Sequence, residues 1–204
     1  MVWKVVILMD TNYLFDVTIG VSNRHVHVSN EALEQLFGEG YELTYFKDLG
    51  QPGQFACVET VTLVGSKGEI DNVRILGPVR RKTQVEISRA DSFKLGIKAV
   101  LRDSGEHEKT PGCTLIGPKG EITIDSGVMV AARHIHITPE MAEQYGLKNK
   151  DHVSAIIGGQ RATVFNNVLV RVRGDYALEF HLDVDEANAA WVNNGDVAKI
   201  IKDK

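Results

Sequence analysis

The sequence has few cysteines, no excess of basic charge and no long apolar run, and each absence excludes a class of protein. Its two cysteines, Cys57 and Cys113, lack Cys-x-x-Cys spacing and are too few for a disulfide scaffold, so reduced thiols are expected. A formal net charge of -4 argues against non-specific binding of nucleic acid. The apolar segment 1–10 is interrupted by Lys4 and is too short to span a bilayer, so neither a signal peptide nor a membrane anchor is expected.

Short strand-like segments dominate what is present. Hydrophobic residues make up 43% and charged residues 25%, which is typical of a globular protein. The segments are rich in β-branched residues and end at glycine, proline or asparagine, so the chain is predicted to be mainly β. They are 1–10, 15–22, 59–65, 71–76, 84–88, 113–117, 121–124, 153–159, 162–172 and 176–184. Short helices are predicted only at 31–37, 140–145 and 185–192.

Two short sequences each occur twice in the chain. RHVHVSNE at 24–31 returns as RHIHITPE at 133–140, and TLVGSKGEI at 62–70 returns as TLIGPKGEI at 114–122. Glycines around the lysine between two apolar segments are typical of a hairpin turn, so the lysines are expected to be turn residues. The repeats predict two related β domains, 20–127 and 128–204, with the boundary at the turn of Ser126 and Gly127.

The His-x-His pairs point to metal binding. Alternate side chains of a strand share a face, so His25 and His27 point the same way, and so do His134 and His136. Such histidines can also form the solvated face of a strand, but the recurrence of the pair within a longer repeat favours a metal site. Zinc takes three or four protein ligands, so further ligands must come from elsewhere in the chain.

Two other predicted strands offer those ligands. Glu86 lies opposite an apolar face in TQVEIS, and His181 lies opposite one in YALEFHLD. The alternative for both is an ordinary surface position. His107 and His152 lie in polar, loop-like sequence and are expected to be solvated.

The spacing His-x-His-x-x-x-Glu, through Glu31 and Glu140, also matches the first motif of the cupins. However, Ser29 and Thr138 suit helix N-caps, and a glutamate that follows the cap turns away from the strand on the helix. This weakens the cupin interpretation.

A basic cluster precedes Glu86. In RILGPVRRKTQVEIS, Arg74 lies on a predicted strand, and Arg80, Arg81 and Lys82 follow a Gly-Pro turn. A solvated basic loop is the ordinary interpretation. The planar guanidinium also binds phosphate through two hydrogen bonds, so an anionic substrate is a second interpretation.

These motifs resemble a known family, the PduL-type phosphate acyltransferases, also called phosphate propanoyltransferases or phosphotransacylases. The resemblance runs in the family's order from Val17 onward, through VSNRHVHVS, FKDLGQPGQFA, ETVTLVGSKGEI, RILGPVRRKTQVEIS, DSFKLGI, AARHIHIT and EFHLDVDEANA. It implies reversible transfer of an acyl group, propanoyl or acetyl, between coenzyme A and phosphate. It also implies two small β-barrels with a dinuclear zinc site between them, the second barrel being completed by an N-terminal strand within 1–19.

Residue by residue, the resemblance implies two zinc ions per chain, held by His25, His27, Glu86, His134, His136 and His181. The family's phosphate-binding arginine falls on Arg80, and further active-site positions fall on Ser22, Lys47, Arg74 and Asn188. Coenzyme A enters as a substrate. A covalent route through Cys57 is an alternative to direct attack by phosphate.

The sequence departs from the family at its start, because 1–16 does not read as the amphipathic extension of members that enter bacterial microcompartments. The bacterial cytoplasm is therefore the expected location, with a microcompartment lumen as the alternative. Homo-oligomerisation stays open, and no nucleic-acid or membrane partner is expected. The rival functions are a bicupin-like metal-dependent oxygenase or isomerase and a non-catalytic β module stabilised by zinc.

Overall fold

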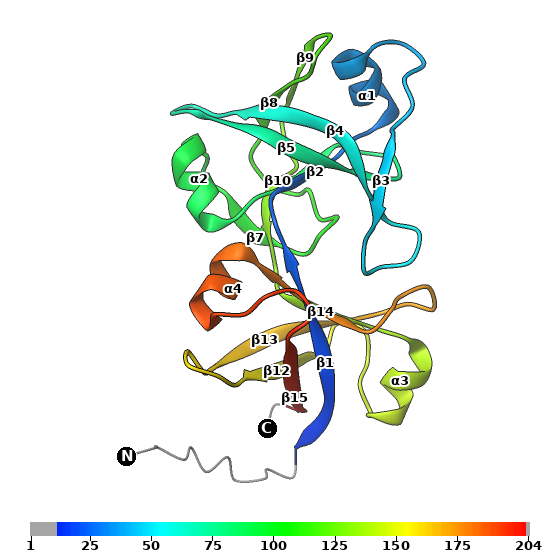
Figure 1. The fold of residues 1–204 in the computed structure, drawn as a ribbon, viewed down its shortest axis with the longest axis vertical. Helices are drawn as coiled ribbons and strands as arrows, with labels where there is room; N and C mark the ends of the chain where they lie inside the picture. The colour runs from blue at the N-terminus through cyan, green and yellow to red at the C-terminus, as the bar shows by residue number, and fades with distance from the viewer. Residues whose placement is uncertain (1–11, 203–204) are drawn as a thin grey trace. The chain divides into compact units, whose positions relative to one another are not determined.

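The protein is mainly β, as the sequence predicts (Figure 1). The structure is a computed structural model that describes residues 12–202, so the strand predicted at 1–10 lies outside the described residues. The described chain divides into two compact units. The barrel unit takes the chain up to Gly20, Arg133–Leu182 and the part from Ala187 onward, and the sheet unit takes Val21–Ala132 and Asp183–Glu186.

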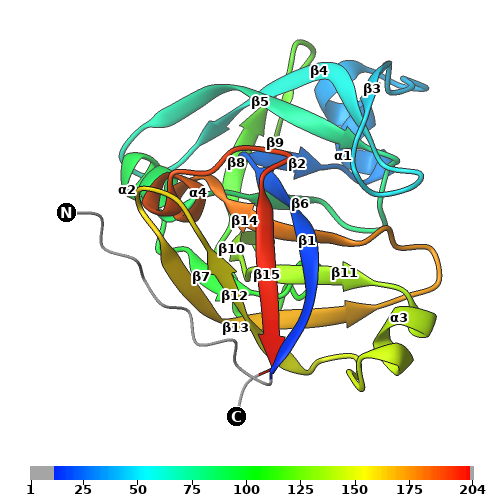
Figure 2. The same ribbon diagram turned by 60° about the horizontal axis from the view of Figure 1, so that its bottom comes forward.

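The barrel unit is a closed six-stranded barrel (Figure 2). In barrel order its strands are β1 (Tyr13–Ser22), β14 (Glu179–Asp183), β11 (His134–Ile137), β13 (Thr163–Val172), β12 (His152–Ile157) and β15 (Val197–Lys202). In β1, Phe15, Val17 and Ile19 are buried and alternate with more exposed residues, which is the pattern of a strand with one face in a core. The strand pairs antiparallel with β15, so segments from both ends of the sequence close this barrel.

The sheet unit is a nine-stranded sheet. Its strands run in the order β7 (Val100–Arg102), β10 (Val128–Ala131), β6 (Gln84–Glu86), β2 (His25–His27), β5 (Glu69–Gly77), β4 (Phe55–Val64), β8 (Cys113–Ile116) and β9 (Glu121–Ile124), with β3 (Tyr45–Asp48) paired to β4. The first His-x-His pair lies on β2, next to β6 in this order. The aliphatic residues in and directly after these two strands belong to one apolar core and are at most 3% exposed: Val26, Val28, Val85 and Ile87. The histidines of β2 therefore lie on the strand face opposite that core.

Four short helices occur in the described residues: α1 (Asn30–Phe37), α2 (Arg89–Leu95), α3 (Pro139–Gln144) and α4 (Val184–Ala190). Three of them confirm the sequence prediction, and α2 was missed. Among its side chains Leu95 is the one buried aliphatic residue, so no apolar periodicity marks it. Reciprocal hydrogen bonds between Ser88 and Asp91 form a capping box that begins α2, and Gly96 in the left-handed region ends it. No helix within residues 12–202 has the length and apolarity needed to cross a membrane.

One local motif occurs four times in the part of the chain that the structure describes: a strand, a capping residue and a short helix, here called the strand-cap-helix motif. The four copies are β2-α1, β6-α2, β11-α3 and β14-α4. The caps are Ser29, Ser88, Thr138 and Asp183, and each side-chain oxygen accepts a hydrogen bond from the amide three residues later. The caps predicted at Ser29 and Thr138 are thus confirmed. At each cap the chain leaves the strand and enters the helix, so the strand residues before the cap still face the neighbouring strand.

The second sequence repeat forms the hairpins β4-β5 and β8-β9 of the sheet unit, and its strands pair symmetrically, with Leu63 opposite Leu115. A Cβ atom on Gly65 would lie 2.1 Å from the carbonyl oxygen of Leu95, and one on Gly117 would lie 2.5 Å from that of Leu36. The repeated glycine is therefore required because each hairpin approaches a helix backbone closely. In Figure 1, α1 lies beside β9 and α2 beside β5.

Candidate metal centres

Two groups of potential metal ligands are present within residues 12–202, one in each unit. Within each group the ligand atoms all lie within 4.8 Å of one another. The groups are His25 with His27 and Glu86, and His134 with His136 and His181. The structure thus brings together, three and three, the six residues that the resemblance implies as ligands.

Strand register builds the first group. Strands β2 and β6 pair antiparallel, with His25 opposite Glu86 and His27 opposite Gln84. The side chains of His25 and His27 on β2 and of Glu86 on β6 therefore converge on one face of the sheet. Gln84 is the fourth member of this face and is itself 1% exposed.

The second group repeats this arrangement in the barrel unit. Strands β11 and β14 pair antiparallel, with His134 opposite His181 and His136 opposite Glu179. Here the third ligand is an imidazole instead of a carboxylate. The fourth position holds Glu179, whose Oε2 lies 2.7 Å from Nε2 of His181.

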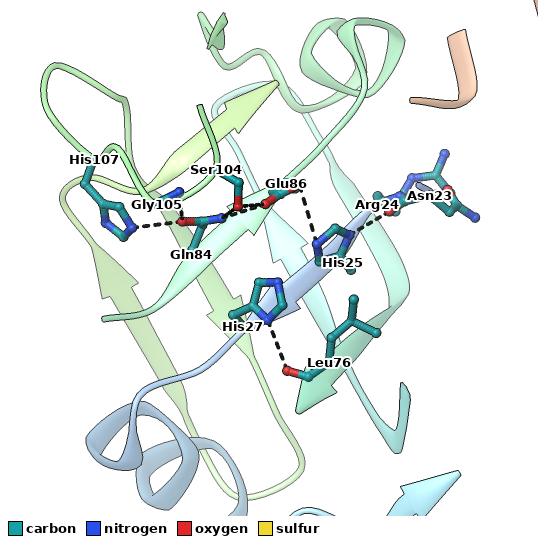
Figure 3. Close-up of polar contacts among 10 residues, drawn as sticks. All are labelled: Asn23, Arg24, His25, His27, Leu76, Gln84, Glu86, Ser104, Gly105 and His107. Carbon is teal, nitrogen blue, oxygen red and sulfur yellow. Dashed lines mark hydrogen bonds and ion pairs between the residues drawn. The ribbon is translucent and has the colours of Figure 1, made fainter. Parts of the chain in front are cut away.

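Hydrogen bonds orient both imidazoles of the first group (Figure 3). Nδ1 of His25 lies 2.8 Å from the carbonyl oxygen of Asn23, and Nδ1 of His27 lies 3.2 Å from that of Leu76. A carbonyl oxygen only accepts, so Nδ1 carries the proton in each ring and the neutral ring keeps the Nε2 lone pair for a metal. Oε2 of Glu86 lies 3.6 Å from Nε2 of His25, within reach of the same ion.

His136 is the central member of the second group. Its ring centroid lies 4.7 Å from those of both His134 and His181, and the ring stacks on Tyr176 at 4.1 Å. The side chain is 5% exposed, and both of its ring nitrogens are buried without a hydrogen-bond partner among the described residues. A buried imidazole in that state is unfavourable unless another group uses its lone pair. A bound metal ion would do so, and the donor set therefore fits zinc.

Their surroundings keep the imidazole of His27 in the first group and that of His136 in the second group neutral. Burial lowers the pKa of His27 well below its ordinary value, and the charges of His25 and Arg80 lower it further. Burial lowers the pKa of His136 to about 2, with smaller contributions from the neighbouring histidines and from Arg171 and Arg173. Neutral imidazole is the form that binds metal, so neither ring has to lose a proton at neutral pH.

We expect these two imidazoles to make the metal-free protein sensitive to acid. In the unfolded chain each takes up a proton below about pH 6.5, whereas in the folded chain it stays neutral, so stability is full above that pH and falls as the pH is lowered. From pH 6.5 to 5.5 each should remove about 1 kcal/mol, because an unfolded histidine is only half protonated at pH 6.5 and the full slope of about 1.4 kcal/mol per pH unit is reached below this range. Urea unfolding of chelator-treated protein between pH 6.5 and 5.5 measures the slope. His136→Phe, which keeps a ring against Tyr176, should reduce the slope by about that amount, and an unchanged slope would contradict this account.

The structure contradicts two alternative interpretations of the His-x-His pairs. The solvated-face interpretation is wrong, because the four histidines of the His-x-His pairs are only 2 to 7% exposed. The cupin arrangement does not form either, because Glu31 and Glu140 are exposed in the first turns of α1 and α3. His152 is exposed as expected, but His107 is half-buried and its Nε2 lies 3.1 Å from Oε1 of Gln84.

The two predicted arginines lie in the sheet unit with the first group. The charge of Arg80 lowers the pKa of His27, so the guanidinium acts on this group. Arg74 is opposite His25 in the parallel pairing of β2 with β5. Its Nη1 donates to the carbonyl oxygen of Cys57 at 2.6 Å, and its guanidinium lies 5.1 Å from the ring centroid of Phe46.

The remaining predicted site residues are less tightly placed. Ser22 ends β1 and is half-buried, and Lys47 lies exposed on β3 of the sheet unit. Asn188 is exposed on α4 in the barrel unit, where its carbonyl oxygen accepts from Nη1 of Arg161 at 3.1 Å. These contacts give the three residues no role of their own, and their assignment stays a prediction.

Sequence reasoning missed the residues at the fourth position of each group, Gln84 and Glu179. Both stand two residues before a predicted ligand and therefore share its strand face. That alternation was the available signal, but neither β6 nor β14 carries a His-x-His pair that would mark it as a copy of the repeated motif.

Fold and site together define a mainly β protein with two largely buried groups of potential metal ligands, each built from a pair of strand-cap-helix motifs. Residues 18–193 match the family model described as phosphate propanoyltransferase, and the chain belongs to this family. It is therefore an enzyme, an acyltransferase of the phosphotransacylase class, as the sequence predicts.

Curated relatives are similar in sequence to this chain over most of their length. The phosphate propanoyltransferase of Thermotoga maritima is 59% identical over 187 residues, which cover 91% of this chain and 89% of the relative. The phosphate propanoyltransferase of Rhodopseudomonas palustris is 53% identical, covering 92% and 83%. That of Clostridioides difficile is 49% identical, covering 91% and 89%.

Proposed function

We propose that the protein reversibly converts an acyl-CoA and inorganic phosphate into an acyl phosphate and free coenzyme A, with propanoyl or acetyl as the acyl group. The observation that most supports this proposal is that a chain of the phosphate propanoyltransferase family contains two largely buried groups of potential metal ligands. Two zinc ions per chain, one at each group, complete the proposal. The dinuclear arrangement implied by the resemblance stays a prediction.

The ligand groups support zinc through their donor chemistry. The first offers two imidazoles and a carboxylate, and the second offers three imidazoles. Catalytic zinc sites commonly have three such protein ligands and leave a position open to substrate. When bound, zinc supplies Lewis-acid polarisation of a carbonyl or phosphoryl oxygen.

Arg80 is proposed to bind the phosphate. Its guanidinium acts electrostatically on His27, which puts a permanent positive charge beside the first ligand group. A guanidinium can donate two parallel hydrogen bonds to phosphate and so orient one oxygen for attack. We propose Arg74, Lys47, Ser22 and Asn188 as further active-site residues, as the resemblance implies.

Direct attack is the proposed route. A phosphate oxygen attacks the thioester carbon, the carbon-sulfur bond breaks, and coenzyme A leaves as a thiolate that takes a proton from water. An acyl-enzyme would need a reactive thiolate. Burial, followed by the charge of Glu59, raises the pKa of Cys57 to about 11, and burial raises the pKa of Cys113 to about 12. Neither thiol is suited to be that nucleophile. Holding both reactants in line is then the main task of the site.

The wider setting is also proposed. We place the enzyme in the bacterial cytoplasm or the lumen of a microcompartment, with acyl-CoA and phosphate as its small-molecule partners. The domain division into 20–127 and 128–204 is kept as a proposal, as is homo-oligomerisation.

Formation of thioester from propanoyl phosphate or acetyl phosphate with coenzyme A tests the function. We expect ultraviolet absorbance to show thioester formation equally under air and argon, in a sample that contains about two zinc ions per chain. Chelation should abolish the activity, and added zinc should restore it. Metal-replete protein without this activity would refute the proposal, and activity that needs iron and oxygen would favour the oxygenase instead.

A further inference from the structure

A hydrogen-bond network holds Oε1 of Glu86, on the side of the carboxylate away from His25 (Figure 3). Nε2 of Gln84 donates to Oε1 of Glu86 at 2.6 Å, and the hydroxyl of Ser104 donates to the same oxygen at 2.7 Å. Nε2 of Gln84 also donates to the hydroxyl oxygen of Ser104 at 3.0 Å. Oε1 thus accepts two hydrogen bonds, while Oε2 is the oxygen on the side of His25.

The orientation of the Gln84 amide is fixed by its other partners. Its Oε1 accepts from the amide of Gly105 at 3.0 Å and lies 3.1 Å from Nε2 of His107. Because an amide oxygen only accepts, His107 carries a proton on Nε2. A flipped amide would direct its N–H groups at the Gly105 N–H and would present oxygen to the Glu86 carboxylate. The network therefore permits one orientation, with the donors toward Glu86.

The loop that supplies these partners is itself anchored. The hydroxyl of Thr110 donates to the carbonyl oxygen of His107 at 2.7 Å and accepts from the amide of Gly127 at 2.7 Å. Gly127 has φ +112°, and a Cβ there would lie 2.8 Å from the carbonyl oxygen of Thr83 and 3.3 Å from Nδ1 of His107. This glycine therefore lets the loop approach the strand that carries Gln84, and the contacts of the loop hold the donors toward Glu86.

We propose that Gln84 is a positioning residue that, together with Ser104, holds Oε1 of Glu86 and leaves Oε2 as the one metal-binding oxygen of this carboxylate. The inference rests on the proposed zinc at the first group. A carboxylate held in this way binds through a single oxygen and cannot rotate to chelate the ion with both. The second group has no counterpart of this amide, because its fourth position is Glu179.

Gln84→Leu and Ser104→Ala test the proposal through zinc affinity. Each removes a donor to Oε1, and we expect the dissociation constant of zinc at the first group to rise about 10- to 100-fold. The affinity of the second group should not change. Competition with a chromophoric chelator resolves the two affinities without any use of activity. Ser104→Thr keeps the hydroxyl and should restore most of the affinity lost in Ser104→Ala.

Cobalt spectra report the coordination itself. In Gln84→Leu, Oε1 keeps only the hydroxyl of Ser104 as a donor, so we expect the carboxylate to turn more readily toward the ion, which raises the coordination number and weakens the visible absorption of bound Co²⁺. The matched control is Ser154→Ala in the barrel unit, which removes a hydroxyl that donates to Oδ1 of Asn166 at 2.9 Å. It can lower stability but should change neither the zinc affinities nor the cobalt spectrum.

The outcomes separate the two levels of the proposal. Wild-type protein that binds no zinc would refute the metal function on which the inference rests. Wild-type protein with two zinc ions, alongside Gln84→Leu and Ser104→Ala with unchanged affinity and cobalt spectra, would refute the positioning role alone. If Gln84→Leu does not fold, Ser104→Ala against Ser104→Thr decides the question.

Discussion

Replacing His136 with alanine is expected to remove one of two zinc ions per chain and to lower kcat on the order of a thousand-fold. His136 is the buried centre of the second group, and its ring nitrogens have no hydrogen-bond partner among the described residues. Without it two imidazoles remain, fewer than the three protein ligands of a typical catalytic zinc. Losing a Lewis acid removes several kcal/mol of transition-state stabilisation, and about 4 kcal/mol corresponds to a thousand-fold.

Metal analysis and steady-state kinetics on the same sample measure this effect. His152→Ala is the matched control, because it removes an exposed histidine from the same unit. That variant should keep both zinc ions and wild-type turnover, and circular dichroism should show that both variants fold. His136→Ala with full zinc content and turnover within two-fold of wild type would show that this group is not a functional metal site.

Arg80→Ala is expected to give the second large effect, this time on phosphate. A bidentate, charge-assisted contact contributes about 2 to 4 kcal/mol, so kcat/KM for phosphate should fall about 30- to 1000-fold. The Michaelis constant for acyl-CoA should change much less. Arg80→Lys keeps the charge but loses the planar fork, so its kcat/KM should lie between those of wild type and Arg80→Ala.

Arg81→Ala is the internal control for this variant. Arg81 is the next residue in the chain and is exposed, so it carries the same charge without belonging to the proposed site. Varying phosphate at saturating acyl-CoA separates the two arginines. If both alanine variants lose phosphate use equally, a general basic field and not a specific contact explains the result.

Local sequence patterns predicted much of the fold. The caps at Ser29 and Thr138 and the alternation in β1 are properties of a few adjacent residues, so they can be read without tertiary structure. Elements that lack such a pattern were missed. Strand β3 is exposed at every position, β10 is a continuous apolar run of four residues, and α2 depends on its capping box.

The candidate site was predictable in part for the same reason. Both His-x-His pairs are visible because their members are two residues apart. The grouping of each pair with Glu86 or His181 depends on the antiparallel pairing of β2 with β6 and of β11 with β14. The role proposed for Gln84 depends on Ser104 and His107, which reach it from a loop about twenty residues further along the chain. Contacts of that kind are set by packing, which no local pattern encodes.

The register of these strand pairs makes parts of the sequence intolerant of length change. Strand side chains alternate with a period of two, so one inserted residue turns every later side chain to the opposite face. An insertion between Gln84 and Glu86 would exchange the carboxylate for an aliphatic neighbour. An insertion at the exposed turn of Gly158 and Gly159, between β12 and β13, would leave the ladder intact, because no other part of the described chain lies within 4 Å of a Cβ atom there. Insertions and deletions within this enzyme should therefore collect at hairpin tips and be absent from the four strands that carry the ligands.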